Sequence, residues 1–264
     1  MMKQRIITAV VAAALFLPIV YFGGIPFVIL VYLLATVGLY ELFSMHKQSL
    51  FSIPGLLAAL LLWVILIPGG HDSLTDALPF TKSELGIVFV LLLLAYTVIT
   101  KNHYTFEDAA FSAFAAAYIG IGFYFFIETR LTGGLVYIFY SLFLIWATDS
   151  GAYFIGKSIG KKKLWPEISP NKTVEGSIGG IVCAMVVGAL FAIFSEIPTN
   201  FFSLLAITVV LSIFGQIGDL VESAFKRHFN VKDSGNILPG HGGILDRFDS
   251  LLFVFPLLHF FHLF

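Results

Sequence analysis

Long apolar runs separated by short polar stretches dominate the pattern along the chain. A helix needs about 20 apolar residues to cross the hydrocarbon core of a bilayer. Nine runs approach that length, and because backbone groups in lipid must be hydrogen-bonded internally, each is predicted to be a helix. The predicted helices cover Ile6–Phe22, Pro26–Phe43, Ile53–Ile67, Leu85–Thr100, Ala109–Ile127, Leu135–Ile155, Val174–Phe194, Phe201–Val221 and Phe248–Phe264.

Composition agrees with a membrane protein. Hydrophobic residues make up 58% of the 264 residues and charged residues only 12%, whereas a soluble chain carries about 25% charged residues. The single cysteine, Cys183, excludes an intrachain disulfide. The expected fold is therefore all-α, a polytopic integral membrane helical bundle with about nine transmembrane helices.

The basic residues predict the orientation of these helices, since Lys and Arg favour cytoplasmic loops. With nine spans and a cytoplasmic N-terminus, only Lys82 and Arg130 of the 15 basic residues lie outside, and eight or ten spans would invert part of this asymmetry. We therefore expect the N-terminus inside and the C-terminus outside. The 13 inside residues are Lys3, Arg5, Lys47, Lys101, Lys157, Lys161, Lys162, Lys163, Lys172, Lys226, Arg227, Lys232 and Arg247.

The distribution of polar residues divides the chain into two predicted parts. Residues 1–130 hold N-terminal transmembrane helices, expected to form a scaffold with contacts to lipid or to a second copy of the chain. Residues 131–264 form the predicted C-terminal catalytic region. It contains two long polar loops, 156–173 and 222–247, both on the cytoplasmic side of the predicted topology.

Four aspartates near the cytoplasmic face are the strongest candidates for chemistry, because carboxylates at the membrane are costly unless they are paired or hydrated. They are Asp149, Asp219, Asp246 and Asp249. Helical spacing places Asp219, Ser223 and Lys226 on one face, and Asp246 and Asp249 on one face of the next helix. Two such faces can meet around Mg²⁺, a hard cation that takes carboxylates and substrate phosphates as ligands.

Basic residues surround these aspartates and indicate an anionic substrate. Lys226, Arg227, Lys232 and Arg247 are candidates to hold phosphate oxygens. In the earlier loop, Lys172 is the basic residue best placed to reach a nucleotide phosphate, and Ser169 or Thr173 can cap the helix that follows. The Lys161–Lys163 triplet has the alternative interpretation of a topology signal or lipid anchor.

The second loop is also rich in glycine. Gly240, Gly242 and Gly243 allow main-chain N–H groups to approach a phosphate, although an ordinary turn is the favoured interpretation of the glycines taken alone. His241 lies among them, and a structural and a functional role remain equally open for it. The formal phosphate-loop pattern from Gly151 to Ser158 is rejected, because it lies in an apolar helix with no strand before it.

The segment from Ser223 to Asp249 resembles the signature of the phosphatidate cytidylyltransferase (CDP-diacylglycerol synthase) family. The matching positions are Ser223, Ala224, Phe225, Lys226, Arg227, Lys232, Asp233, Ser234, Gly235, Leu238, Pro239, His241, Gly242, Gly243, Ile244, Asp246, Arg247, Phe248 and Asp249. Asp149–Tyr153 and Ser169–Gly176 also resemble family segments. The resemblance covers roughly residues 146–250, and the first half of the chain is similar only in being a set of apolar helices.

The resemblance implies a reaction in which CTP and phosphatidic acid give CDP-diacylglycerol and pyrophosphate. It implies Mg²⁺, with a second cation such as K⁺ left open, and a homodimer in the cell (inner or plasma) membrane with its site facing the cytoplasm. No nucleic-acid partner is expected.

The residue patterns and the resemblance together lead to a hypothesis for the roles of individual residues. The expected metal ligands are Asp219, Asp246 and Asp249. The expected catalytic residues, some of which hold phosphates, are Asp219, Lys226, Arg227, Lys232, His241, Asp246, Arg247 and Asp249. The expected substrate-binding residues are Asp149, Ser169, Asn171, Lys172, Thr173, Ser223, Gly242 and Gly243, and Asp149 is a further candidate metal ligand.

Two other functions remain open from the sequence. A CTP-dependent kinase of a polyprenol or dolichol would share a helical membrane fold and a CTP site, but it would release CDP. A secondary transporter would use intramembrane carboxylates to carry ions. It would, however, be expected to have paired repeats and charges near the midplane, whereas here the charges gather at one face.

Overall fold

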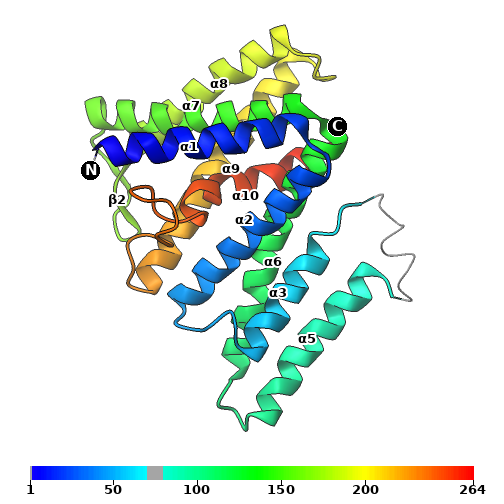
Figure 1. The fold of residues 1–264 in the computed structure, drawn as a ribbon. Coiled ribbons are helices and arrows are strands. Elements are labelled where there is room, and N and C mark those ends of the chain that lie inside the picture. The colour runs from blue at the N-terminus through cyan, green and yellow to red at the C-terminus, as the bar shows by residue number, and fades with distance from the viewer. Residues whose placement is uncertain (1, 70–79) are drawn as a thin grey trace. The chain divides into compact units, whose positions relative to one another are not determined.

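The computed structural model describes residues 2–69 and 80–264, and its helices and strands carry the labels of Figure 1. The described α-helices are α1 (Met2–Phe22), α2 (Gly24–Met45), α3 (Ile53–Ile65), α5 (Lys82–Ile99), α6 (Phe106–Glu128), α7 (Leu135–Ile159), α8 (Val174–Phe194), α9 (Phe201–His228) and α10 (Leu245–Phe260). A π-helical turn, η1 (Thr129–Gly133), joins α6 to α7.

The protein is an all-helical membrane protein, as the apolar runs predicted. Within the described residues, six helices are long and apolar enough to cross a membrane: α2, α5, α6 continued by η1, α7, α8 and α9. Helices α1 and α3 have shorter apolar stretches. Every predicted run coincides with one helix, and Val174–Phe194 has the predicted ends.

The main difference from the predicted boundaries is at the end of α9. The apolar run ends at Val221, but the helix continues to His228, so the polar segment predicted from residue 222 begins about two turns later. Lys226 forms an i, i+4 ion pair with Glu222 at 2.7 Å, and such pairs stabilise a polar helical turn. The phosphate-loop pattern is rejected by the structure as well, because Gly151–Ser158 lies inside α7.

A short hairpin interrupts the otherwise helical chain. Strands β1 (Lys163–Trp165) and β2 (Ser169–Thr173) pair antiparallel, with Lys163 opposite Thr173 and Trp165 opposite Ser169. The apolar pattern could not predict it, because a hairpin of eleven residues with mostly exposed side chains has no apolar alternation to detect.

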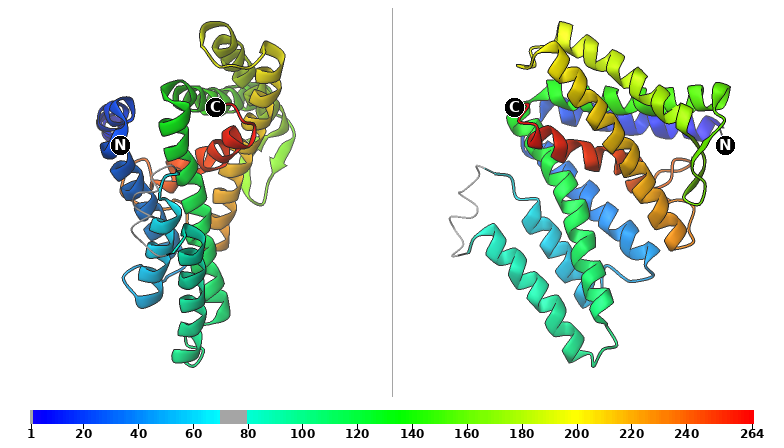
Figure 2. Two further views of the ribbon diagram at one scale, coloured as in Figure 1. Left: turned by 90° about the vertical axis from the view of Figure 1, so that its right-hand side faces the viewer. Right: turned by 180° about the vertical axis from the view of Figure 1, so that it is seen from behind.

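The described chain divides into two compact units. Unit 1 comprises Met1–Glu128 with Asp233–Leu245, and unit 2 comprises Thr129–Lys232 with Asp246–Phe264. In unit 1, α3 packs against α5 and α6, and α2 packs against α1, α3 and α6; the right-hand view of Figure 2 shows α3, α5 and α6 side by side. In unit 2, α7 packs along α8, and α9 contacts both. The roles assigned to residues 1–130 and 131–264 stay predictions.

Glycines bring the helices of unit 2 unusually close. A Cβ atom on Gly176 of α8 would lie 2.7 Å from the carbonyl oxygen of Ala152 in α7, and one on Gly180 would lie 2.6 Å from that of Thr148. On α9, a Cβ atom on Gly218 would lie 2.5 Å from the carbonyl oxygen of Asp249 in α10. These contacts set α7, α8, α9 and α10 at distances that only glycine permits.

Candidate functional site

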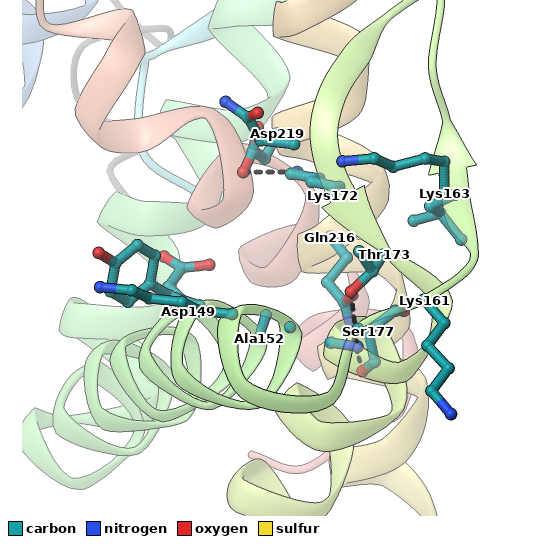
Figure 3. A pocket seen from close by; sticks show the side chains of 16 residues that line it. Asp149, Ala152, Lys161, Lys163, Lys172, Thr173, Ser177, Gln216 and Asp219 are labelled. Carbon is teal, nitrogen blue, oxygen red and sulfur yellow. Dashed lines mark hydrogen bonds and ion pairs between the residues drawn. The ribbon is translucent and has the colours of Figure 1, made fainter.

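A pocket of about 530 Å³ lies in unit 2, where α7, the hairpin and the first turns of α8 meet α9 (Figure 3). Its size is within the range of small-molecule sites. Four lysines and two aspartates contribute to its wall, so the pocket suits an anion that carries several charges. The lining residues are Asp149, Ala152, Tyr153, Gly156, Lys157, Gly160, Lys161, Lys163, Leu164, Asn171, Lys172, Thr173, Gly176, Ser177, Gln216 and Asp219.

An ion pair between Lys172 and Asp219 crosses the wall of this pocket. The Nζ atom of Lys172, on β2, lies 2.7 Å from Oδ2 of Asp219, on α9, and Figure 3 shows the lysine reaching from the hairpin to the aspartate. Both side chains keep about 30% of their surface exposed, 28% and 31%. Because the pair is open to the pocket, an incoming anion can compete with Asp219 for the ammonium group.

The hairpin that carries Lys172 is tied to the first turn of α8. Glu175 accepts hydrogen bonds from the backbone N–H groups of Lys161, at 3.0 Å, and Lys162, at 3.2 Å. Thr173 caps the helix, since its Oγ1 accepts from the N–H of Gly176 at 3.1 Å, as predicted from its place before the apolar run. The cap and the Glu175 contacts give β2 a defined position beside α7.

A second charged group lies where α9 meets α10. Lys226 Nζ contacts Glu222 Oε2 and Asp246 Oδ1, both at 2.7 Å, and the two acidic side chains are only 2% and 7% exposed. Among the described residues, Oε1 of Glu222 has no hydrogen-bond partner although it is buried. One lysine therefore contacts two buried carboxylates, and Oε1 of Glu222 is left without a hydrogen bond among the described residues.

Three more aspartates belong to the same electrostatic network. Asp149 interacts with Asp219, and Asp249 interacts with both of them. The close approach of α10 at Gly218 explains how Asp249 comes beside Asp219. Arg247 also interacts electrostatically with Asp149. The structure thus links Asp149, Asp219 and Asp249 electrostatically, and Asp246 joins them through Glu222 and Lys226.

The balance of charge in this network fits a hard cation. Five carboxylates, from Asp149, Asp219, Glu222, Asp246 and Asp249, face three basic groups, from Lys172, Lys226 and Arg247. Oxygen ligands are those that Mg²⁺ prefers, and it usually takes only one or two carboxylates together with phosphates and water. Within residues 2–69 and 80–264, however, no three His, Cys, Asp or Glu side chains are grouped so that they could hold a metal ion by themselves.

Several predicted site residues of unit 2 have other contacts in the structure. Arg227 donates from Nε to the carbonyl oxygen of Ile168 at 3.1 Å and so ties the hairpin to α9. Ser223 donates to Asp219 Oδ1 at 3.3 Å. Ser169 forms part of β2, and Lys232 is exposed. Of the substrate-binding candidates, Asp149, Asn171, Lys172 and Thr173 line the pocket.

His241, Gly242 and Gly243 belong to unit 1, because the Asp233–Leu245 segment is part of that unit. The backbone folds into a tight turn here, with Leu238 N–H donating to Gly242 O at 3.0 Å. Gly240 and Gly242 have φ of 79° and 81°, values that glycine adopts without strain. The conformation of the turn therefore explains why glycine occupies positions 240 and 242. The phosphate-binding role of this turn stays a prediction.

Sequence reasoning missed several residues of the site. Lys157, Lys161 and Lys163 were not selected as site residues, yet they line the pocket, and Figure 3 shows Lys163 pointing towards Lys172 while Lys161 points away. Glu222 was passed over, although its i, i+4 spacing to Lys226 was a detectable signal. Gln216, which donates to the carbonyl oxygen of Ser177 at 3.3 Å, had no such signal.

A polytopic helical membrane protein with a basic pocket beside clustered carboxylates has the equipment of an enzyme that transfers phosphate-containing groups. Comparison with known sequences specifies this class further. The chain belongs to the cytidylyltransferase family, whose model matches residues 3–264.

Curated relatives match the chain over nearly its whole length. It is 57% identical over 261 residues to the phosphatidate cytidylyltransferase of Bacillus subtilis, covering 98% of this chain and 97% of the relative. It is 50% identical over 258 residues to the proteins of the same name from Staphylococcus haemolyticus and Staphylococcus aureus, covering 98% of both chains in each case.

Proposed function

We propose that this protein transfers CMP from CTP to phosphatidic acid, giving CDP-diacylglycerol and pyrophosphate for phospholipid synthesis. The names of its relatives support this reaction. The observation in the structure that carries it is the exposed Lys172–Asp219 pair in a pocket with three further lysines. A nucleoside triphosphate is the kind of polyanion that such a pocket would bind.

The proposed mechanism is an in-line displacement. An oxygen of the lipid phosphate attacks the α-phosphorus of CTP, a new P–O bond forms, and the bond to the bridging oxygen breaks so that pyrophosphate leaves. The lipid phosphate is already an anionic nucleophile, so the reaction needs no strong general base. The main barrier is to bring two polyanions together, which positioned cations reduce.

The residues of unit 2 divide this task. Lys172 and the lysines of the pocket would hold the triphosphate, since an ammonium group binds phosphate oxygens as a compact point charge. Lys226 would keep Asp246 in place, and Arg247 would hold phosphate oxygens through its guanidinium fork. Lys232 and Arg227 would supply further positive charge. From the sequence, His241, which belongs to unit 1, is predicted to steady the departing pyrophosphate.

Mg²⁺ fits this site because its carboxylates outnumber its basic groups and offer only hard oxygen ligands. Asp219, Asp246 and Asp249 would hold the ion, with Asp149 as a further candidate, and substrate phosphates would complete the shell. When bound, it would neutralise charge on the phosphates. A second cation such as K⁺ is part of the proposal only through the resemblance to the family.

The topology that agrees with this function has nine spans, an N-terminus in the cytoplasm and a C-terminus outside. It would put both polar segments on the side where CTP is found. The protein would reside in the cell membrane, and phosphatidic acid would enter the site from the bilayer with its acyl chains still in lipid. The resemblance also implies a homodimer, which light scattering of the detergent-solubilised protein would test.

A product assay tests the proposal. Purified protein in detergent would receive phosphatidic acid, Mg²⁺ and CTP labelled on the α-phosphate, with and without EDTA. We expect the label to enter a lipid and pyrophosphate to appear in equal amount, and EDTA to abolish both. CTP labelled on the γ-phosphate is the matched control, because its label should leave in pyrophosphate.

The same assay separates the two other functions. Conversion of CTP to CDP, with the γ-label transferred to an added polyprenol, would identify a lipid kinase. The absence of CTP turnover with any of these lipids would overturn the cytidylyltransferase proposal and leave the transporter to be tested.

A further inference from the structure

Glu41 is a buried acidic residue that the sequence analysis did not select. It lies in the last turns of α2, and only 1% of its surface is exposed. Burying a carboxylate is costly unless its charge is compensated by hydrogen bonds or a counter-ion. Its position in an apolar helix therefore calls for a reason.

The carboxylate of Glu41 binds both ends of the Asp233–Leu245 segment. Oε1 accepts from the backbone N–H of Ile244 at 2.8 Å, and Oε2 accepts from that of Leu245 at 3.0 Å and from the hydroxyl of Ser234 at 3.1 Å. Hydrogen bonds to an ionised acceptor are about twice as strong as neutral ones. One side chain thus closes a loop of thirteen residues at its base.

The glycines of this segment are shaped around Glu41. A Cβ atom on Gly235 would lie 2.6 Å from Glu41 Oε1, and one on Gly243 would overlap both Glu41 and Ser234. Leu245 also packs against α2, where a Cβ atom on Gly38 would lie 3.1 Å from its Cδ2 atom. The tip of the segment has its own contact, because Thr8 Oγ1 donates to Pro239 O at 3.1 Å.

The bonded N–H groups belong to the start of α10. That helix begins at Leu245, and the first N–H groups of a helix have no partner within it. A carboxylate at this end also interacts favourably with the helix dipole. The next residues of α10 include Asp246, Arg247 and Asp249. The backbone conformation at residues 244 and 245 therefore determines the position and direction of the first turn of α10, which carries these side chains.

We propose that Glu41 is a positioning residue for the reaction: by capping α10 and closing the Asp233–Leu245 segment, it sets the backbone from which Asp246 and Asp249 project. This inference rests on the proposed function. Glu41 would act indirectly, through its bonds to backbone atoms of residues 244 and 245 and not through contact with a substrate.

The experiment compares Glu41→Gln with the wild-type full-length protein in detergent. The amide keeps the size of the side chain, but it has only one acceptor oxygen and turns its NH₂ group towards an N–H donor. We expect kcat to fall about 10–100-fold, the usual effect of removing a group that orients a metal ligand. Because the pocket around Lys172 is unchanged, we expect KM for CTP to change less than about 3-fold.

Two further readouts distinguish positioning from a general loss of stability. The Mg²⁺ concentration for half-maximal rate should rise about 10-fold, because Asp246 and Asp249 are displaced. Amide hydrogen exchange, which does not depend on activity, should accelerate in peptides covering 233–245 and not elsewhere. Glu107→Gln is the matched control, since Glu107 is an exposed glutamate of the same unit, and it should alter none of these quantities.

Two results would overturn the proposal: a wild-type rate and Mg²⁺ dependence in Glu41→Gln, or faster exchange throughout the chain with an unchanged Mg²⁺ dependence. If Glu41→Gln does not fold, Ser234→Ala decides, because it removes one of the three hydrogen bonds. A loss of about 2–5-fold in kcat with local faster exchange supports the proposal, and no change in either contradicts it. A wild-type protein without cytidylyl transfer would overturn the proposed function, while exchange would still show whether Glu41 holds the segment.

Discussion

Two carboxylates in unit 1 and two in unit 2 have partners of different kinds. In unit 1, Glu41 and Glu128 accept hydrogen bonds from backbone N–H groups: those of Ile244 and Leu245 in the first case, and that of Gly69, at 2.7 Å, in the second. In unit 2, Asp219 and Asp246 are paired with lysine side chains, Lys172 and Lys226.

This difference has a chemical consequence. A backbone N–H cannot leave its acceptor unless the chain moves, so a carboxylate bonded in this way stabilises a conformation. A lysine has a flexible stem and three donors, and it can exchange one anion for another. Asp219 and Asp246 are therefore carboxylates that can change partners when a triphosphate and a cation enter, whereas Glu41 and Glu128 hold chain segments in place.

The largest effect is expected from Asp246→Asn. The amide keeps the shape of the side chain but removes the charge that Lys226 pairs with and that a cation would need. We expect kcat to fall on the order of 10²–10³-fold, as when one electrostatic contact to the reacting groups is removed. The measurement is single-turnover transfer of the α-label from CTP to lipid.

The control for this variant is Glu196→Gln, which removes one exposed carboxylate from unit 2 and should retain the wild-type rate. Size-exclusion profiles and circular dichroism would establish that both proteins are folded. If Asp246→Asn turned over at nearly the wild-type rate, Asp246 would not be a metal ligand, and the contrast between the two units would lose its strongest support.

A smaller effect is expected from Lys172→Met, which removes the ammonium group from the pocket and leaves an apolar chain of similar length. We expect kcat/KM for CTP to fall about 10–100-fold, mostly through KM, because a charged contact to phosphate is worth roughly 1.5–3 kcal/mol. Lys162→Met is the matched control, since the side chain of Lys162 is exposed and lies outside the set that lines the pocket. Equal losses in the two variants would contradict a specific role for Lys172.

The limits of sequence reasoning follow the same division. The helices could be predicted, because an apolar run long enough to span a bilayer has few alternatives. Asp149 and Asp219 could be selected because they lie near the ends of the predicted apolar runs, where charge near lipid needs an explanation. Which lysine pairs with which aspartate could not be predicted, since Lys172 and Asp219 lie 47 positions apart and meet through the hairpin.

The hydrogen bonds of Glu41 could not be predicted from the sequence either, for a different reason. Its partners are backbone N–H groups, which every residue has, so no residue type in the sequence marks the interaction. The glycines at 235 and 243 carried part of the signal, but glycine is equally compatible with an ordinary turn. Bonds between side chain and backbone over a separation of about 200 residues become visible only in three dimensions.

The close packing in unit 2 can be broken by Gly176→Ala. The added methyl group would lie 2.7 Å from Ala152 O and 3.1 Å from the Cα atom of Gly156, so α7 and α8 must separate. We expect a loss of about 1–3 kcal/mol, the usual cost of overpacking, measured as a lower Tm in detergent. Gly86→Ala is the control, because its nearest neighbour is 3.9 Å away. An unchanged Tm for Gly176→Ala would show that the two helices can move apart freely.

The smallest effect on turnover is expected from Glu128→Gln, which tests the comparison from the side of unit 1. Glu128 is buried, accepts from Gly69 N–H, and interacts electrostatically with Lys82. Loss of its charge should destabilise the fold by roughly 1–2 kcal/mol and lower the Tm, while kcat changes less than about 2-fold. Glu41→Gln is the matched variant, because it also removes a buried, backbone-bonded carboxylate but releases the segment that leads to Asp246. If both variants lost turnover equally, backbone-bonded carboxylates would matter to the reaction through stability alone.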